Sequence, residues 1–221
     1  MRDLRICFVG DSYINGTGDE HCLGWIGRLC RKRFNRSFQM TYYDLGIRGA
    51  TTDDILDRWR SECDKRFTDG ADNRIVFQFG INDVAIVTDL GRRVEEETSV
   101  NNAVLMVREA AENWPVLWVG LPPANVACSP MHPSPGLEID FSQSTAGSLN
   151  RRFIMTAAKL GVPYLDIQSP LLANQDYMDS LTRGDQMHCS GSGYAIMADL
   201  VDKWVGWSAW FEPEIPDPGG S

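Results

Sequence analysis

The sequence has few of the residues from which metal sites and redox sites are built. It contains three histidines and six cysteines in 221 residues, and no two cysteines form a Cys-x-x-Cys pair. A zinc ribbon and a thioredoxin-like motif are therefore excluded. A metal-dependent phosphoesterase usually needs several His and Asp ligands that converge, and three histidines make that alternative a poor one. Scattered thiols fit the reducing cytoplasm, where we expect the protein to be located.

Long apolar runs and an excess of basic residues are also missing. No run approaches the length of a membrane span, and the opening residues MRDLRICFVG lead into a predicted strand rather than a signal peptide. Lysine and arginine number 21 against 30 acidic residues, for a formal net charge of −9. This balance argues against nucleic acid and against an anionic membrane as partners. It does not restrict the binding of a small neutral molecule.

Short apolar runs alternate with helical patterns along the chain. Hydrophobic residues make up 43% of it, which is enough for a packed core. The predicted strands are 4–9, 40–45, 74–79, 116–121 and 163–167. Helices are predicted around 25–30, from Thr51, around 100–111, and over 143–160, 176–182 and 192–207. Five alternations predict an α/β fold with a parallel sheet that has helices on both faces.

We expect one domain over residues 1–210, followed by a disordered tail over 211–221 that is rich in proline and glycine. Inside the domain, residues 124–140 form the longest irregular stretch. They carry Pro130, Pro133, Pro135 and Gly136. Long irregular segments on such folds are often functional, so this one could be a lid or a substrate loop.

Polar residues and glycines follow the first three predicted strands. Ser12 comes after the first strand, Gly49 after the second and Asn82 after the third. Each is an ordinary turn residue when it is considered alone. Ligands of parallel α/β sheets bind at the carboxyl ends of the strands, which meet at one edge. The three residues are therefore expected to lie near one another.

Acyl transfer by a serine needs a nucleophile, an oriented base and donors for an oxyanion. Ser12 offers a hydroxyl, and His188 is the best base of the three histidines. Asp185, three residues earlier, can fix the imidazole tautomer, although Asp-x-x-His is more often a turn cap beside a surface histidine. Without a Cβ, Gly49 can bring its N–H to a substrate, and Asn82 offers an amide N–H₂.

Four blocks in the sequence together resemble those of the SGNH hydrolases, also called GDSL esterases. The blocks are GDSY at 10–13, GIRGATT at 46–52, GIND at 80–83 and DQMH at 185–188. They occur in the family order, and the resemblance covers about residues 4–207. It implies a flavodoxin-like three-layer α/β/α sandwich with five parallel strands. It also implies an enzyme that uses no metal and no organic cofactor.

The resemblance assigns roles to five residues. Ser12 would be the nucleophile, His188 the general base and Asp185 its partner. The oxyanion hole would be formed by Ser12, Gly49 and Asn82. Because only two residues separate Asp185 from His188, the short loop itself can restrict how the imidazole turns. We therefore expect part of this orientation to survive loss of the carboxylate.

The leading prediction is a serine esterase that hydrolyses carboxylic esters of small or medium acyl groups through an acyl-enzyme on Ser12. A thioesterase or a lysophospholipase on the same site stays open, as does a binding module that has lost turnover. Tyr13 stands where the family motif has leucine. Tyr13, Ile81 and Val84 could contact the acyl group of a small-molecule ester, or they could pack in the core.

Overall fold

A five-stranded parallel sheet lies at the centre of the protein, which a computed structural model describes over residues 1–34, 38–123, 129–134, 136–141 and 145–212. The strands are β1 (Arg2–Gly10), β2 (Phe38–Gly46), β3 (Asp72–Gln78), β6 (Val116–Val119) and β9 (Tyr164–Leu165). Their order is β2-β1-β3-β6-β9, and each neighbouring pair is parallel. Counted along the chain, this is the 2-1-3-4-5 order of flavodoxin-like folds.

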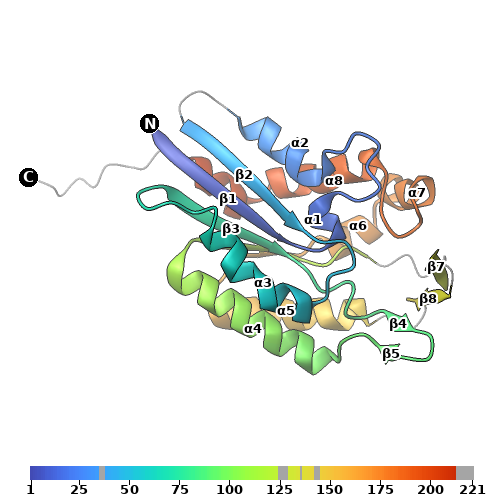
Figure 1. Ribbon diagram of the computed structural model, residues 1–221. Coiled ribbons are helices and arrows are strands. Elements are labelled where there is room, and N and C mark those ends of the chain that lie inside the picture. Colours follow the sequence, from blue (N-terminus) through green and yellow to red (C-terminus); the bar gives the residue numbers. More distant parts are fainter. Residues whose placement is uncertain (35–37, 124–128, 135, 142–144, 213–221) are drawn as a thin grey trace, which may run out of the picture.

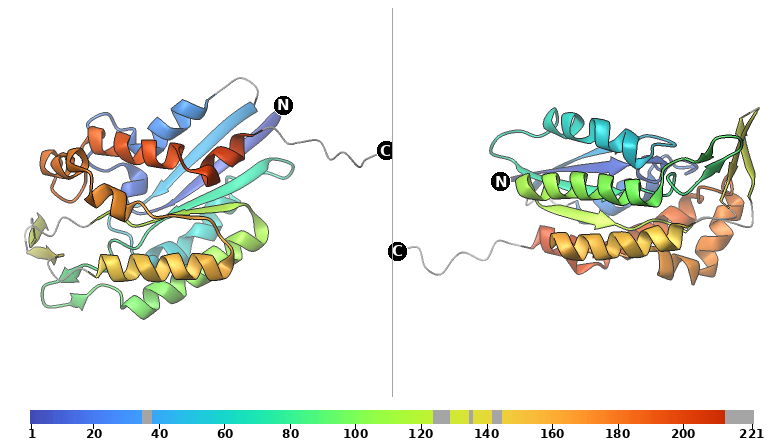
Figure 2. Two further views of the ribbon diagram at one scale, coloured as in Figure 1. Left: turned by 180° about the vertical axis from the view of Figure 1, so that it is seen from behind. Right: turned by 90° about the horizontal axis from the view of Figure 1, so that it is seen from below.

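Helices cover both faces of this sheet. They are α1 (Ser12–Asn15), α2 (Gly24–Arg33), α3 (Thr52–Asp64), α4 (Glu96–Asn113), α5 (Ala146–Leu160), α6 (Gln168–Leu172), α7 (Gln175–Arg183), α8 (Gly191–Asp202) and α9 (Val205–Ser208). Helices α3 and α4 lie on one face, and α2 and α8 lie on the other (Figures 1 and 2). The predicted three-layer α/β/α sandwich is confirmed. Within the described ranges, no helix is both long and apolar enough to cross a bilayer.

The central strands form because they are buried on both sides. Residues 6–10 of β1 and all four residues of β6 are buried, and such strands appear in sequence as continuous apolar runs. Helix α3 begins at the predicted place, at a capping box. The Thr51 side chain accepts a hydrogen bond from the Asp54 N–H, and the Asp54 side chain accepts one from the Thr51 N–H. This cap fixes where the chain leaves the loop after β2.

Two predictions near the C-terminus are wrong. The helix predicted over 192–207 is interrupted, because Trp204 takes an extended conformation between α8 and α9. Phe211, assigned to the disordered tail, belongs to a short 3-10 helix, Ala209–Phe211. Its ring packs 4.8 Å from that of Trp207 and 5.7 Å from that of Phe38. Residues 213–221 and the first residues of the predicted helix 143–160 lie outside the described ranges.

A second, smaller sheet was not predicted. It consists of β4 (Ile86–Val87), β5 (Gly91–Arg92), β7 (Met131–Ser134) and β8 (Leu137–Asp140), in the antiparallel order β5-β4-β8-β7. It lies beyond the carboxyl ends of the parallel strands (Figure 1). The stretch 124–140, predicted to be irregular, therefore contributes two paired strands, while 124–128 and 135 are outside the described residues. Strands of two to four residues are too short to show a period in sequence.

Candidate active site

Ser12 lies where β1 ends, at the carboxyl edge of the sheet. Gly10, the last residue of β1, pairs with Gly46 on β2 and with Gln78 on β3, so the three strands end at the same level. A Cβ on Gly10 would lie 1.9 Å from the Gln78 carbonyl oxygen, and only glycine allows this close approach. Asp11 then caps α1 by accepting a hydrogen bond from the Tyr13 N–H. The serine side chain follows directly and is 3% exposed.

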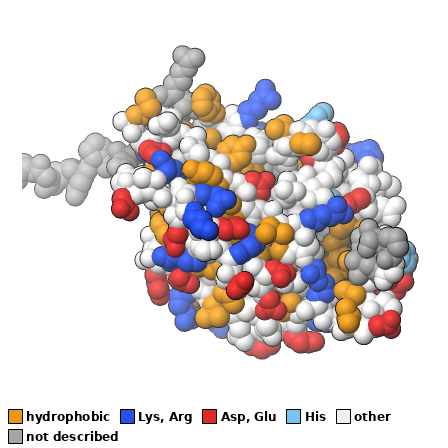
Figure 3. Space-filling model, viewed as in Figure 1, with side chains coloured by type: hydrophobic (Ala, Val, Ile, Leu, Met, Phe, Trp, Pro, Cys, Tyr) orange, Lys and Arg blue, Asp and Glu red, His pale blue; other side chains and the backbone are white. Residues whose placement is uncertain are grey.

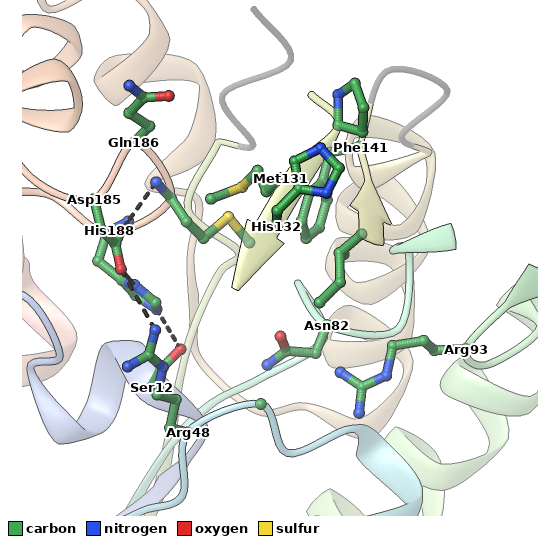
Figure 4. A pocket seen from close by; sticks show the side chains of 14 residues that line it. Ser12, Arg48, Asn82, Arg93, Met131, His132, Phe141, Asp185, Gln186 and His188 are labelled. Carbon is green, nitrogen blue, oxygen red and sulfur yellow. Dashed lines mark hydrogen bonds and ion pairs between the residues drawn. The ribbon is translucent and has the colours of Figure 1, made fainter. Parts of the chain in front are cut away.

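Ser12, His188 and Asp185 form one hydrogen-bonded chain (Figure 4). His188 Nε2 lies 2.8 Å from Ser12 Oγ, and His188 Nδ1 lies 2.8 Å from Asp185 Oδ2. The other carboxylate oxygen of Asp185 accepts the backbone N–H groups of Met187 and His188, at 3.0 and 2.6 Å. Residues 12 and 188, far apart in sequence, thus meet because the loop between α7 and α8 reaches the end of β1.

The Asp185 carboxylate is held in its ionised form. Burial opposes ionisation, but hydrogen bonds and charge attraction from His188, with the N–H of Met187, lower the pKa of Asp185 to about 2. The guanidinium of Arg48 lies 3.7 Å from Asp185 Oδ2 and is largely exposed. The imidazole therefore faces a negative charge at any pH near neutrality.

Three N–H groups near Ser12 are available to a ligand. The N–H groups of Ser12 and Gly49 donate to no acceptor among the residues that the structure describes. Gly49 has a φ of +79° in the turn from Ile47 to Ala50, a conformation that favours glycine. Asn82 Nδ2 donates one hydrogen to the Ala50 carbonyl at 3.0 Å and keeps a second. The three predicted residues Ser12, Gly49 and Asn82 all line one cavity.

A buried network joins the two segments that carry Gly49 and Asn82, and the sequence did not reveal it. Asp83 accepts hydrogen bonds from the Thr52 N–H at 2.9 Å and from the Thr52 hydroxyl at 2.6 Å. Asn102 on α4 in turn donates to Thr52 Oγ1 at 3.1 Å. Asp83 and Thr52 lie inside the quoted blocks, which could have suggested the pair. No sequence signal marks Asn102.

The cavity has a volume of about 510 Å³ and mixed walls (Figure 4). Its apolar lining is supplied by Pro130, Met131, Ile139, Phe141 and Met187. Its polar and charged lining consists of Ser12, Arg48, Asn82, Arg93, His132, Asp185, Gln186 and His188, with Gly49. Much of the apolar wall comes from the second sheet and the residues that flank it. Because that sheet was not predicted, the sequence did not indicate this wall.

The three residues considered as acyl contacts are elsewhere. Tyr13, Ile81 and Val84 are at most 2% exposed, belong to the hydrophobic core and do not line the cavity. Ser12 and Asn82 face the cavity, whereas the side chains next to them in sequence, Tyr13 and Ile81, point into the core. These three side chains, Tyr13, Ile81 and Val84, therefore pack in the core, which was the alternative considered for them. Tyr13 also donates its hydroxyl to the Met187 carbonyl at 2.6 Å.

This fold and this hydrogen-bonded serine, histidine and aspartate at the edge of the sheet define a class, the hydrolases built on a three-layer α/β/α sandwich. The family model of the GDSL-like lipase/acylhydrolase family matches residues 8–196. The chain belongs to this family. A comparison with curated proteins gave no match.

Solved structures share the fold at low sequence identity. A lipase/acylhydrolase from Enterococcus faecalis is 20% identical with a TM-score of 0.66, over 93% of this chain and 96% of that one. An acetylxylan esterase from Geobacillus stearothermophilus is 17% identical with a TM-score of 0.66, over 89% and 91%. A psychrotrophic esterase from Pseudoalteromonas sp., in a structure inhibited by monoethylphosphonate, is 15% identical with a TM-score of 0.64, over 93% and 97%.

Proposed function

We propose that the protein is a serine esterase that hydrolyses carboxylic esters of small or medium acyl groups through an acyl-enzyme on Ser12. The observation that carries this proposal is the pair of 2.8 Å contacts that join Ser12 Oγ to His188 Nε2 and His188 Nδ1 to Asp185 Oδ2. In this geometry the Nδ1–H is held by the carboxylate, which leaves the Nε2 lone pair facing the serine hydroxyl.

The reaction follows from this arrangement. Ser12 Oγ attacks the ester carbonyl carbon while His188 Nε2 takes the hydroxyl proton, and a tetrahedral intermediate forms. The negative oxygen accepts hydrogen bonds from the free N–H groups of Ser12 and Gly49 and from the second amide hydrogen of Asn82. His188 then gives its proton to the departing alkoxide, and the acyl-enzyme remains. A water molecule repeats the sequence, releasing the acid and restoring the serine.

The cavity supports an ester of modest size as the substrate. Met131, Ile139 and Phe141 provide apolar surface close to the serine, within a volume of about 510 Å³. Two of the structures that share the fold are described as esterases, and one of them is inhibited by a phosphonate, the class of reagent that modifies an activated serine. Both points support ester hydrolysis here.

The metal-dependent phosphoesterase has less support. Within the described residues, no group of three or more His, Cys, Asp or Glu side chains is placed to hold a metal ion. His188 instead uses both of its ring nitrogens on Ser12 and Asp185. We therefore expect ester hydrolysis to be unaffected by EDTA, and loss of activity on chelation would favour the metal mechanism.

A fluorophosphonate probe tests the nucleophile directly. We expect covalent modification of the peptide that contains Ser12, no modification of Ser12→Ala, and a loss of about 10⁶-fold in kcat for that variant. Ser192→Ala is the matched control, because this serine is exposed on α8 and does not line the cavity, and it should label like the wild type. Labelling mapped to another serine, or undiminished labelling of Ser12→Ala, would contradict the proposal.

A further inference from the structure

Arg93 is a charged residue of the cavity that the proposed mechanism does not use. Its backbone is tied to the loop that carries Asn82: the Arg93 N–H donates to the Ala85 carbonyl at 3.0 Å, and the Val94 N–H donates to the Asp83 carbonyl at 3.2 Å. Figure 4 shows its guanidinium turned toward Asn82, across the cavity from Ser12 and His188. The position of Arg93 is therefore set by the same segment that positions an oxyanion donor.

The guanidinium of Arg93 has free hydrogen-bonding capacity. Among the described residues its side chain makes no hydrogen bond and no ion pair, although it carries five N–H donors. Arg93 contributes to lowering the pKa of Asp54, but the hydrogen bond from the Thr51 backbone is the larger cause. Asp54 Oδ2 already accepts both the N–H and the hydroxyl of Thr51, at 2.8 and 2.7 Å. Asp54 is thus committed to capping α3.

The cavity has an excess of positive charge. Its described lining includes two arginines and one carboxylate, Asp185, and Arg48 already lies beside that carboxylate. Among the residues that the structure describes, Arg93 is the lining arginine that has no ion pair. The chain as a whole carries a formal charge of −9, and acidic and basic side chains are interspersed over the face in Figure 3. A cation in this cavity, without an ion pair to any described residue, is a local feature of an acidic protein. A cleft concentrates the field of such a charge on a molecule that enters it.

We propose that the natural substrate is an ester that carries a second, negatively charged oxygen group, such as a carboxylate or a phosphate, and that Arg93 binds this group. The inference rests on the proposed ester hydrolysis at Ser12 and adds the class of ester. A guanidinium matches the geometry of carboxylate and phosphate oxygens, with two parallel hydrogen bonds. Met131 and Phe141 supply apolar surface for the hydrocarbon part of such a molecule.

Pairs of esters in which a free carboxylate is compared with its methyl ester test this proposal. For the acyl side we would compare 4-nitrophenyl hydrogen glutarate with its neutral methyl ester. For the alcohol side, 4-acetoxybenzoate is compared with its methyl ester, and 4-acetoxyphenyl phosphate distinguishes a phosphate from a carboxylate. The wild type should give a higher kcat/KM for the charged member of at least one pair. That preference should weaken as KCl is raised from about 0.05 to 0.5 M, because salt screens the attraction.

Arg93→Gln should lower the ratio of charged to neutral kcat/KM by about 10- to 100-fold, the range expected for hydrogen bonds to a charged group. Arg93→Glu should invert the preference. Arg92→Gln is the control, because Arg92 is the last residue of β5 and directly precedes Arg93. It donates to Thr145 Oγ1 at 2.7 Å and does not line the cavity. It should keep the wild-type ratio.

Two outcomes overturn the inference while leaving the proposed function intact. One is a wild type that hydrolyses both members of every pair equally. The other is an Arg93→Gln variant that labels normally with the fluorophosphonate and yet keeps the wild-type ratio. Failure of the proposed function would look different, since the wild type would then show no labelling at Ser12 and no hydrolysis of either member.

Discussion

At the scale of single residues, Asp185 has two tasks in its loop. Oδ2 faces the ring nitrogen of His188, while Oδ1 accepts the N–H groups of Met187 and His188 and so shapes the loop itself. From the sequence, part of the orientation of the imidazole was expected to survive loss of the carboxylate, through the short loop itself. In the structure the carboxylate builds that loop, so the two contributions cannot be separated by removing the whole side chain.

Asp185→Asn separates them. Its side-chain oxygen can still accept the two loop N–H groups, but its amide N–H₂ would face His188 Nδ1. That contact favours the tautomer with a proton on Nε2, which cannot accept the proton of Ser12, and we expect kcat to fall by about 10⁴-fold near pH 7. The measurement is kcat and KM on one activated ester from about pH 6 to 10.

Asp179→Asn is the control for this prediction, since Asp179 is exposed on α7 and, within the described part of the chain, its side chain accepts a hydrogen bond from Gln175 alone, at 2.8 Å. It should match the wild type. If Asp185→Asn stayed within tenfold of the wild type at pH 7, the carboxylate would not be what sets the tautomer, and the backbone of the loop would be sufficient.

At the scale of elements, the site depends on how α1 is held against the loop before α8. Tyr13, the second residue of α1, donates its hydroxyl to the Met187 carbonyl at 2.6 Å, and its ring lies 5.5 Å from that of His188. Tyr13, next to Ser12, thus holds Met187, the residue next to His188. Tyr13 stands where the family motif has leucine, which could supply the packing but not this hydrogen bond.

Tyr13→Phe should therefore lower kcat by about 3- to 10-fold with little change in KM, because the ring packing is kept and one hydrogen bond of about 1 kcal/mol is lost. The matched control is Tyr194→Phe, which removes a hydroxyl that donates to the Thr17 carbonyl at 2.7 Å. We expect its kcat to stay within twofold. A change confined to KM, or an equal loss of kcat in both variants, would show that Tyr13 does not position His188 in this way.

The second sheet is the element that sequence patterns could not give. Its two halves are joined by the pairing of β4 with β8, in which Ile86 lies opposite Asp140. Just after β4, the Thr88 N–H donates to the Glu138 carbonyl at 3.2 Å. Two-residue strands such as β4 and β5 have no periodicity. The pairing of β4 with β8 depends on where the larger sheet places the two loops. For the same reason, the sequence did not indicate that Met131, Ile139 and Phe141 form part of the cavity wall.

At the scale of the whole molecule, the features that the sequence predicted are those with local causes. Buried parallel strands must be apolar, so β1, β3 and β6 were located to within a few residues. The rule that ligands bind at carboxyl strand ends, together with the four blocks, indicated that Ser12, Gly49 and Asn82 meet at one edge. Arg93 lies in none of the four blocks, and the strand before it, β5, has only two residues. Its role depends on contacts that only the folded chain creates.

Asp11 connects the site to the stability of the whole protein. It is 1% exposed at the end of β1, and its side chain accepts the Tyr13 N–H at 2.9 Å. Burial raises the pKa of this carboxyl to about 7, with a further increase from the charge of Asp83 that is opposed by Arg58 and by the Tyr13 hydrogen bond. An aspartate in the unfolded chain has a pKa of about 3.9.

The effect on stability follows from this difference. Below about pH 4 both states are protonated and no penalty arises. Between about pH 4 and 7 the folded protein keeps a proton that the unfolded chain releases, so the free energy of unfolding falls as the pH rises. Above about pH 7 both states are ionised and the full penalty, on the order of 4 kcal/mol for three pKa units, applies.

Asp11→Asn should remove this dependence, because the amide does not titrate and its oxygen can still accept the Tyr13 N–H. We expect the free energy of unfolding of the variant, relative to the wild type, to increase by several kcal/mol between about pH 4.5 and 8. Urea titrations at several pH values measure it, with Asp57→Asn, an exposed position on α3, as the control that should follow the wild type. A difference between Asp11→Asn and wild type that stays constant with pH would mean that Asp11 remains ionised in the folded protein at pH 5, despite its burial.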